Sequence, residues 1–432
     1  MNQPLVLVSI AVLALASINP RAAANEPSPA AAGKIAFGPT DWPWWRGPDR
    51  NGIAASDQQP PAQWSETQNV VWSSPVPGRG HGSPTVVGDR LFLATAEHDR
   101  EVQSVLCYDR RTGALRWQTA IHQGGFEKKG NSKSSLASST VACDGTRLFV
   151  NFLHDGAVYT TALDLDGRQL WQTKITGFVT HQGFGSSPAI YDGLVIVSAD
   201  NKGTGLIAAL DRARGQFVWK HERPSVPNYT SPIILTVAGR EQLLFTGCDK
   251  VSSFEPLTGK KIWEIDGATT ECVTSTVTDG NLIFTSGGYP RNHISAVRAD
   301  GSGQIAWENN VRVYVPSLLA RAGYLYGVTD AGVAFCWKAA TGDEIWKHRL
   351  GGTFSASPVF VGDLIFATNE AGLTFIFKAT PTAIEVVGEN TLGSEVFATP
   401  TICGGRIYMR VAGQKDGKRQ ETLYCLGQAP AK

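Results

Sequence analysis

Short apolar segments alternate with polar turns along most of the chain, and the pattern is clearest in residues 83–120. Residues 83–87 are apolar and β-branched, Gly88-Asp89 supplies a tight turn, and residues 91–95 alternate as a half-buried strand does. A second hairpin follows, in which Val102–Asp109 and residues 115–120 are joined by a turn that contains Gly113. We therefore predict a unit of four antiparallel strands.

A sheet of this size has two open edges and too little apolar surface to stand alone, so it needs neighbours of the same kind. The chain supplies them, because a hydroxyl residue before an apolar strand and a Gly/Asp turn recurs at Ser83, Ser139, Ser187, Ser231, Ser275, Ser317, Ser357 and Thr399. A tryptophan in the closing strand recurs from Trp117 to Trp346 at intervals of 54, 48, 44, 44 and 39 residues. Repeats of 40 to 50 residues are typical of propeller blades.

The two ends of the repeat complete each other. The last unit ends after its third strand, at residues 422–426, and an additional strand, Val70–Val76, precedes the first unit. Pairing these two strands would complete an eighth sheet and remove the last open edge. We predict an all-β fold, an eight-bladed β-propeller of four-stranded antiparallel blades closed by residues 70–76 and 422–426, in one domain of residues 41–427.

The closing tryptophans have a structural interpretation. Each is expected to pack its ring between neighbouring blades while its indole N–H reaches a backbone acceptor. The residues assigned to blade docking are Trp72, Trp117, Trp171, Trp219, Trp263, Trp307 and Trp346.

The N-terminus indicates export. Residues 5–16 are an apolar run too short to span a bilayer, and Ala22-Ala23-Ala24 fits the small-residue cleavage rule, which predicts a signal peptide over residues 1–24. No Lys or Arg precedes the apolar run, so an uncleaved anchor stays as an alternative. Residues 25–40 form a Pro/Ala-rich linker. We expect a periplasmic or extracellular protein with no transmembrane segment after signal cleavage.

Charge and cysteine content narrow the classes of partner. The chain has 39 basic and 38 acidic residues, and a net charge of +1 argues against nucleic acid and against a polybasic membrane patch. Seven cysteines leave at least one thiol unpaired in an exported protein. Cys248 and Cys272 are expected near the same end of neighbouring blades, where a disulfide is one alternative and two free thiols the other.

Propeller topology assigns loops to faces. The loop between the second and third strands and the connection to the next blade open on one face, which is predicted to hold six of the eight histidines. Long loops are disproportionately functional, and the connections 121–136 and 414–420 are the long ones, although long loops also collect polar residues without a function. The residues assigned to a ligand- or partner-binding face are His81, Lys133, His181, Gln182, Phe184, Asn228, Tyr229, Glu271, Tyr289, Arg291, Tyr314 and Glu395.

The chemistry of this set suits a polar ligand or a partner's peptide. No two histidines stand at metal-ligand spacing, so no metal site is predicted. Glu271 and His181 could serve as acid and base if they meet, but the sequence does not show that they do, and no catalytic residue is assigned. Dinucleotide, phosphate-loop and nucleophile-elbow motifs are absent from the sequence.

The repeat also carries a family resemblance. Asp109-x-x-Thr112-Gly113-x-x-x-Trp117, echoed around Trp263 and Trp346, resembles the tryptophan-docking motif of the pyrroloquinoline-quinone (PQQ) type, quinoprotein alcohol dehydrogenase-like propeller repeat. The resemblance extends over residues 42–426. Residues 42–52 also resemble a segment that precedes the first blade in secreted bacterial proteins of this group, and they are expected to cap the ring.

The resemblance implies two functions. Quinoprotein dehydrogenases of this fold use PQQ and Ca²⁺, and a metal set is sought here among Asn228, Glu271 and Asp330, but the adjacent cysteine pair of many such enzymes is absent. Other members are cofactor-free and bind protein partners, as the scaffold lipoprotein of the outer-membrane β-barrel assembly machinery does, although this chain has no lipoprotein signal. We expect a monomeric, cofactor-free binding or scaffold module for a cell-envelope protein or polar ligand. The alternative is a PQQ- and calcium-dependent dehydrogenase that oxidises alcohols or sugars.

Overall fold

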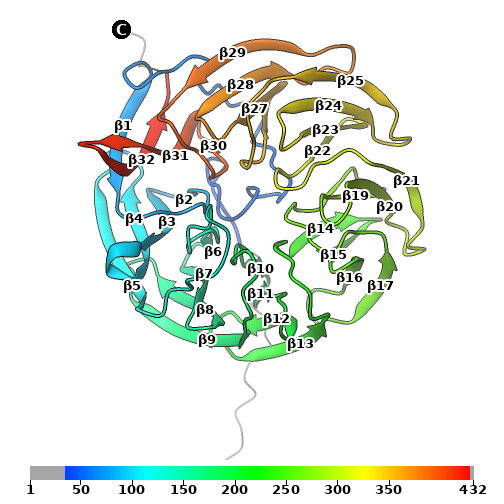
Figure 1. Ribbon diagram of the computed structural model, residues 1–432, viewed down its shortest axis with the longest axis horizontal. Helices are drawn as coiled ribbons and strands as arrows, with labels where there is room; N and C mark the ends of the chain where they lie inside the picture. Colours follow the sequence, from blue (N-terminus) through cyan, green and yellow to red (C-terminus); the bar gives the residue numbers. More distant parts are fainter. Residues whose placement is uncertain (1–34, 429–432) are drawn as a thin grey trace, which may run out of the picture.

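The computed structural model describes residues 35–428 as eight four-stranded antiparallel sheets arranged in a ring (Figure 1). The predicted fold class and the number of blades are confirmed. The predicted signal peptide, residues 1–24, and most of the predicted linker lie outside the described residues. Ile35 and Phe37, at the end of that linker, pack against a buried apolar cluster of the propeller, and the Phe37 ring meets the edge of Trp44.

The first four blades follow one another along the chain. Blade 1 contains β2 (Thr85–Val87), β3 (Arg90–Glu97), the short helix η2 (His98–Arg100), β4 (Val102–Asp109) and β5 (Leu115–Gln123). Blade 2 contains β6 (Ala142–Cys143), β7 (Arg147–His154), β8 (Ala157–Asp164) and β9 (Gln169–Gly177). Blade 3 contains β10 (Ala189–Tyr191), β11 (Leu194–Ser198), β12 (Gly205–Asp211) and β13 (Phe217–Arg223). Blade 4 contains β14 (Ile233–Val237), β15 (Arg240–Gly247), β16 (Lys250–Phe254) and β17 (Lys261–Asp266).

The other four complete the ring. Blade 5 contains β18 (Val277–Thr278), β19 (Leu282–Gly287), β20 (His293–Arg298) and β21 (Ile305–Asn309). Blade 6 contains β22 (Leu319–Arg321), β23 (Tyr324–Val328), β24 (Val333–Lys338) and β25 (Glu344–Arg349). Blade 7 contains β26 (Val359–Val361), β27 (Leu364–Thr368), β28 (Leu373–Lys378) and β29 (Glu385–Thr391). Blade 8 contains β30 (Thr401–Cys403), β31 (Arg406–Lys415), β32 (Lys418–Leu426) and β1 (Val70–Val76).

Blade 8 joins the two ends of the chain, as predicted. Strand β1 pairs antiparallel with β32, with Ser74 opposite Leu423. The expected long loop at residues 414–420 is wrong, because β31 and β32 continue as one hairpin that turns at Asp416-Gly417. The hairpin projects from the rim (Figure 1), where no neighbouring blade requires apolar side chains, so its polar sequence shows no strand alternation.

The docking tryptophans join successive blades. Six of the seven indoles donate to a carbonyl oxygen of the next blade, for example Trp219 Nε1 to Pro256 O at 3.0 Å. Five of these six rings pack on the turn glycine of the next blade; a Cβ on Gly259, for example, would lie 2.6 Å from Trp219 Cδ2. Trp346 meets a turn without glycine, where its indole donates to Thr380 O. Trp263 is also buried, but its indole nitrogen has no hydrogen-bond partner within the described part of the chain.

The hydroxyl residues that open each unit form a second inter-blade connection around the axis. The backbone N–H of Ser187 donates to Ser231 Oγ at 2.9 Å, and equivalent bonds join most neighbouring blades. Because Ser83 bonds across to Thr140 in this way, the first strand begins at Thr85 and not at the predicted position 83.

The segment before β1 fills one end of the central channel, where it crosses the middle of the ring (Figure 1). Asp41 accepts a hydrogen bond from Gly88 N in the turn between β2 and β3, at 2.9 Å. Further along, Arg46 Nη2 donates to Leu318 O at 2.6 Å, and Ala54 N donates to Phe360 O at 2.8 Å. These contacts reach blades 1, 6 and 7, so the segment connects blades that are distant in sequence and closes the channel.

Candidate functional site

A cavity of about 630 Å³ lies on the ring axis. Its walls come from the blade-to-blade connections, and Trp45 of the N-terminal segment also lines it, held by a 2.7 Å hydrogen bond from its indole nitrogen to Ser275 Oγ. Because that segment fills the channel from the side of the tight turns, the cavity is blind and opens on the loop-rich face. A rigid ring therefore holds loops of differing chemistry around one space.

Nine of the twelve residues assigned to the binding face line this cavity, namely His81, Lys133, His181, Gln182, Phe184, Tyr229, Glu271, Tyr289 and Tyr314. The other three lie elsewhere. Asn228 is buried behind the wall, where its Nδ2 donates to Asp200 Oδ2 and to Thr246 O, both at 3.0 Å. Glu395 pairs with Arg419 at 2.5 Å, and Arg291 is exposed in the loop between β19 and β20.

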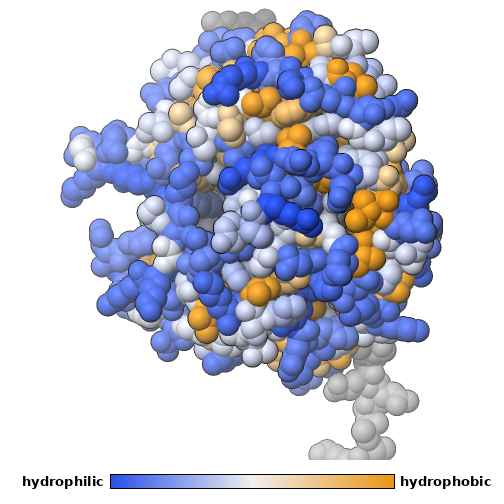
Figure 2. Space-filling model, turned by 45° about the vertical axis from the view of Figure 1, so that its right-hand side comes forward, coloured by the Kyte–Doolittle hydropathy of each residue, from blue (hydrophilic) through white to orange (hydrophobic). Residues whose placement is uncertain are grey.

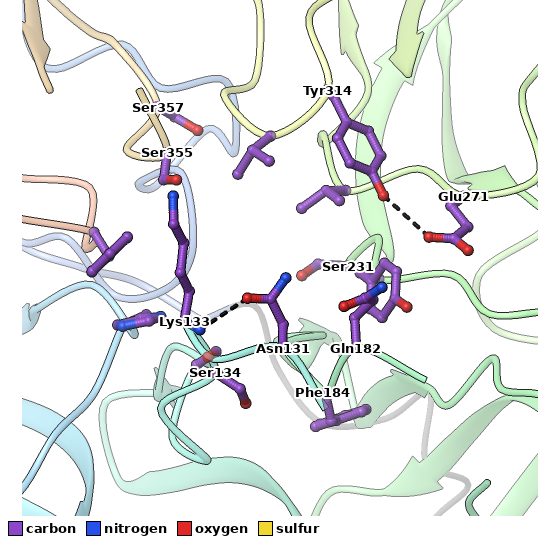
Figure 3. Close-up of a pocket in the computed structure, with 18 of the residues that line it drawn as sticks. Asn131, Lys133, Ser134, Gln182, Phe184, Ser231, Glu271, Tyr314, Ser355 and Ser357 are labelled. Atoms are coloured by element: carbon purple, nitrogen blue, oxygen red, sulfur yellow. Dashed lines mark hydrogen bonds between the residues drawn. The ribbon is translucent and has the colours of Figure 1, made fainter. Parts of the chain in front are cut away.

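One wall of the cavity is acidic and aromatic, and we call it the Glu271 corner: His181, Tyr229, Glu271, Tyr289 and Tyr314. Glu271 Oε1 lies 3.2 Å from His181 Nε2, and Oε2 accepts a hydrogen bond from the Tyr314 hydroxyl at 3.2 Å (Figure 3). Burial raises the pKa of Tyr229 and Tyr314, and the charge of Glu271 raises the pKa of each phenol further. His181 and Glu271, 90 positions apart, therefore do meet.

The corner is held by the backbone of neighbouring loops. Glu271 N donates to Tyr289 O at 3.2 Å, which joins the start of blade 5 to its own β19–β20 loop. Tyr314 N donates to Asp330 Oδ2 at 2.8 Å, and burial raises the pKa of that carboxyl. The backbone at Glu271 and Tyr314 is thus fixed by loops of blades 5 and 6.

The opposite wall is cationic (Figure 3). Lys133 Nζ pairs with Glu370 at 2.7 Å, which joins the connection after blade 1 to blade 7. The His81 ring packs against Phe397, with the ring centroids 4.5 Å apart and the planes tilted by 33°. The pKa of His81 is held well below its ordinary value by burial first and then by the surrounding charges of Arg79, Arg410, Arg419 and Lys133.

The sequence prediction missed Trp45 and Phe397, which also line the cavity. Phe397 stands two positions before the repeated hydroxyl residue Thr399. The same position in other blades also lines the cavity, as His81, Gly185, Tyr229, Val273, Val315 and Ser355. Counting back two positions from each repeated hydroxyl would have found Phe397. Trp45 lies outside the repeat, and no comparable rule points to it.

The residues sought for a Ca²⁺ ion do not fit one. Asn228 Oδ1 already accepts from Cys272 N at 3.1 Å, and the Asp330 carboxylate accepts the backbone N–H groups of Tyr314 and Val315. Among residues 35–428, no group of three or more His, Cys, Asp and Glu side chains is arranged to hold a metal ion. The structure therefore provides no ligand set from Asn228, Glu271 and Asp330.

The seven cysteines are buried free thiols, so the disulfide alternative for Cys248 and Cys272 is wrong. Cys248 Sγ instead lies 3.5 Å from Asp200 Oδ2, and burial raises the pKa of Cys272 to about 11. In the described part of the chain, no helix has the length and apolar character that crossing a bilayer requires.

Comparison with known proteins places the chain in a family. A sequence profile of the family described as outer membrane protein assembly factor BamB matches residues 101–348 and 290–384. The chain is 26% identical over 360 residues to BamB of Burkholderia pseudomallei, covering 78% of this chain and 84% of that protein. It is 23% identical over 349 residues to tetrathionate hydrolase of Acidithiobacillus ferrooxidans, covering 71% of this chain and 66% of the hydrolase.

Among solved structures, a europium-containing methanol dehydrogenase has the same fold. The two superpose with a TM-score of 0.66 at 13% sequence identity, covering 90% of this chain and 98% of the dehydrogenase. Because the identity is low, this likeness concerns the fold alone. The family profile matches well over half of the chain, and the chain therefore belongs to the PQQ-type propeller family described as outer membrane protein assembly factor BamB.

Proposed function

We propose that this protein is exported to the cell envelope and acts as a binding or scaffold module that takes a polar segment of a protein partner into its axial cavity. The observation that carries the proposal is the blind cavity of about 630 Å³, which the connections of most blades line with polar and aromatic side chains. Family membership supports a binding role in the envelope.

The size and the chemistry of the cavity suit such a ligand. Sites for small molecules and side chains usually measure about 300 to 1,000 Å³ and combine aromatic walls with a few placed polar groups. The visible outer surface is mostly hydrophilic, with only small apolar patches (Figure 2). A partner that docks here therefore meets polar loops first, and the aromatic groups lie inside the cavity.

Partner capture tests this proposal. The tagged protein is cross-linked in cells, purified from the envelope fraction and compared with a variant carrying His181→Ala and Glu271→Ala. We expect the variant to keep its melting temperature within a few degrees and to lose a partner that the parent chain captures, because both side chains face the cavity. Capture of the same partner by both proteins would contradict the proposed place of binding.

A PQQ-dependent dehydrogenase is the second candidate, and the fold likeness to a methanol dehydrogenase supports it. The quinone would bring the redox chemistry, and Trp45 at the closed end of the cavity offers an indole as part of its surroundings. The side chains described here do not form the accompanying calcium site. Purified protein incubated with PQQ and Ca²⁺ should show no bound quinone spectrum and no dye-linked oxidation of alcohols or sugars. A bound quinone spectrum or such an oxidation would favour the dehydrogenase.

A further inference from the structure

Glu271 differs from other buried carboxylates of the propeller in its ion-pair partner, which is a histidine and not an arginine. Its side chain is 7% exposed, and the basic group beside it is the His181 imidazole, whose Nε2 lies 3.2 Å from Glu271 Oε1. Four other carboxylates have side chains that are 1% to 8% exposed, and each of them faces an arginine: Asp41 with Arg110, Asp144 with Arg212, Asp200 with Arg223, and Glu421 with Arg410.

This difference has an energetic consequence. Burial of a carboxylate is unfavourable unless a counter-charge and hydrogen bonds compensate for the lost water. An arginine supplies that charge at every physiological pH, whereas an imidazole supplies it only when protonated. Tyr314 adds one hydrogen bond and no charge. Among the residues that the structure describes, the ion pair recorded for Glu271 is with His181 and none is recorded with an arginine or lysine, so Glu271 presents a buried carboxylate to the cavity without a permanently charged ion-pair partner.

The surrounding aromatic rings favour a cation in the same place. Tyr229, Tyr289, Tyr314 and Phe184 line the cavity on this side. Aromatic faces attract cations, and the attraction grows when the cation is withdrawn from water. The Arg312 guanidinium carbon, on a residue that also lines the cavity, lies 5.4 Å from the centroid of the Tyr314 ring, so one aromatic ring of the corner already attracts a cation.

We propose that the Glu271 corner binds a primary alkylammonium group. In the proposed function, on which this inference rests, the group is a lysine side chain of the partner protein, and a free diamine offers the same chemistry. The ammonium would lie against Glu271 and the tyrosine rings, while its aliphatic chain passes Phe184. Lys133 and the cations around His81 lie on the opposite wall and disfavour the reverse orientation.

Isothermal titration calorimetry on the mature protein tests the proposal with three probes: the blocked tripeptide Gly-Lys-Gly, the same peptide with Nε-acetyllysine, and cadaverine. We expect the lysine peptide to bind and acetylation to weaken binding at least tenfold. Glu271→Gln should also weaken binding at least tenfold while near-ultraviolet circular dichroism and melting temperature stay unchanged. Glu344→Gln, at an exposed position on the outer strand β25, is the matched control and should bind as the parent chain does.

Each other outcome is informative. Binding of cadaverine without the peptide would support the ammonium site and assign it to a free amine. Equal binding of the acetylated peptide, unchanged affinity of Glu271→Gln, absence of binding by every amine, or Ca²⁺ binding that depends on Glu271 in place of amine binding would each overturn the proposal. Envelope capture that still depends on the cavity would, in that case, leave the proposed function standing.

Discussion

Blade docking makes a quantitative prediction at the turn of blade 4. Gly259 has φ +69°, and a Cβ on it would lie 2.6 Å from Trp219 Cδ2 and 2.8 Å from Trp219 Cε3. Gly259→Ala should cost about 1 kcal/mol for the left-handed backbone. It should cost about 1 to 3 kcal/mol more because the indole must move out of a packed interface. We expect a total loss of about 2 to 4 kcal/mol in the free energy of unfolding, measured by urea denaturation.

The same blade contains the control. Gly239, in the turn between β14 and β15, has φ +75°, and no atom of residues 35–428 outside its chain neighbours lies within 4 Å of an added Cβ. Gly239→Ala should therefore show only the backbone cost, about 1 kcal/mol. Equal losses in the two variants would refute the reasoning, since they would mean that contact with Trp219 contributes nothing.

Three further predictions concern the tryptophans, a buried ion pair and pH. Trp219→Phe should destabilise the fold more than Trp263→Phe, by about 1 kcal/mol in urea denaturation, because only the Trp219 indole loses a bond, to Pro256 O; equal losses would contradict this. Arg223→Ala should cost about 3 to 5 kcal/mol, because it leaves the carboxylate of Asp200, 1% exposed, without its arginine; a loss below 1 kcal/mol in the same assay would contradict this prediction. In the folded chain, burial holds the pKa of His81 well below 6.5 and the pKa of His122 and His293 at about 4. The unfolded chain therefore binds protons that the folded chain rejects, and the free energy of unfolding should fall as the pH drops from 6.5 toward 4, by up to about 1.4 kcal/mol per pH unit for each histidine. Urea midpoints at pH 7, 6 and 5 measure this fall, and equal midpoints would contradict it.

Most of the fold could be predicted because it is encoded locally and repeatedly. Alternating apolar residues and a closing tryptophan mark seven of the eight blades, and blade 7 closes with β29, which has no tryptophan. The strand Val70–Val76 could be assigned to the ring because it lacked a sheet of its own. The hairpin tip at residues 414–420 could not be predicted in the same way, because backbone pairing in solvent requires no apolar pattern. The partnerless indole of Trp263 depends on small displacements between blades, which no residue pattern records.

The candidate site was predictable as a face and less so as a set of contacts. Topology alone brought His81, Lys133 and Tyr229 to the cavity. The pairing of His181 with Glu271 depends on side-chain directions across two blade connections, which sequence spacing does not determine. Asn228 was assigned to the binding face because of its loop position, but hydrogen bonds to Asp200 and Thr246 direct its side chain away from the cavity, behind the wall.

The most direct test of the central claim asks which face of the ring meets the partner. A photo-reactive phenylalanine analogue replaces Tyr289, which is 55% exposed at the cavity mouth, or Thr341, which is exposed in the turn between β24 and β25 on the opposite face. Irradiation of living cells should yield a defined cross-linked envelope protein from position 289 and none from position 341. Cross-links from position 341 alone would contradict binding at the loop-rich face.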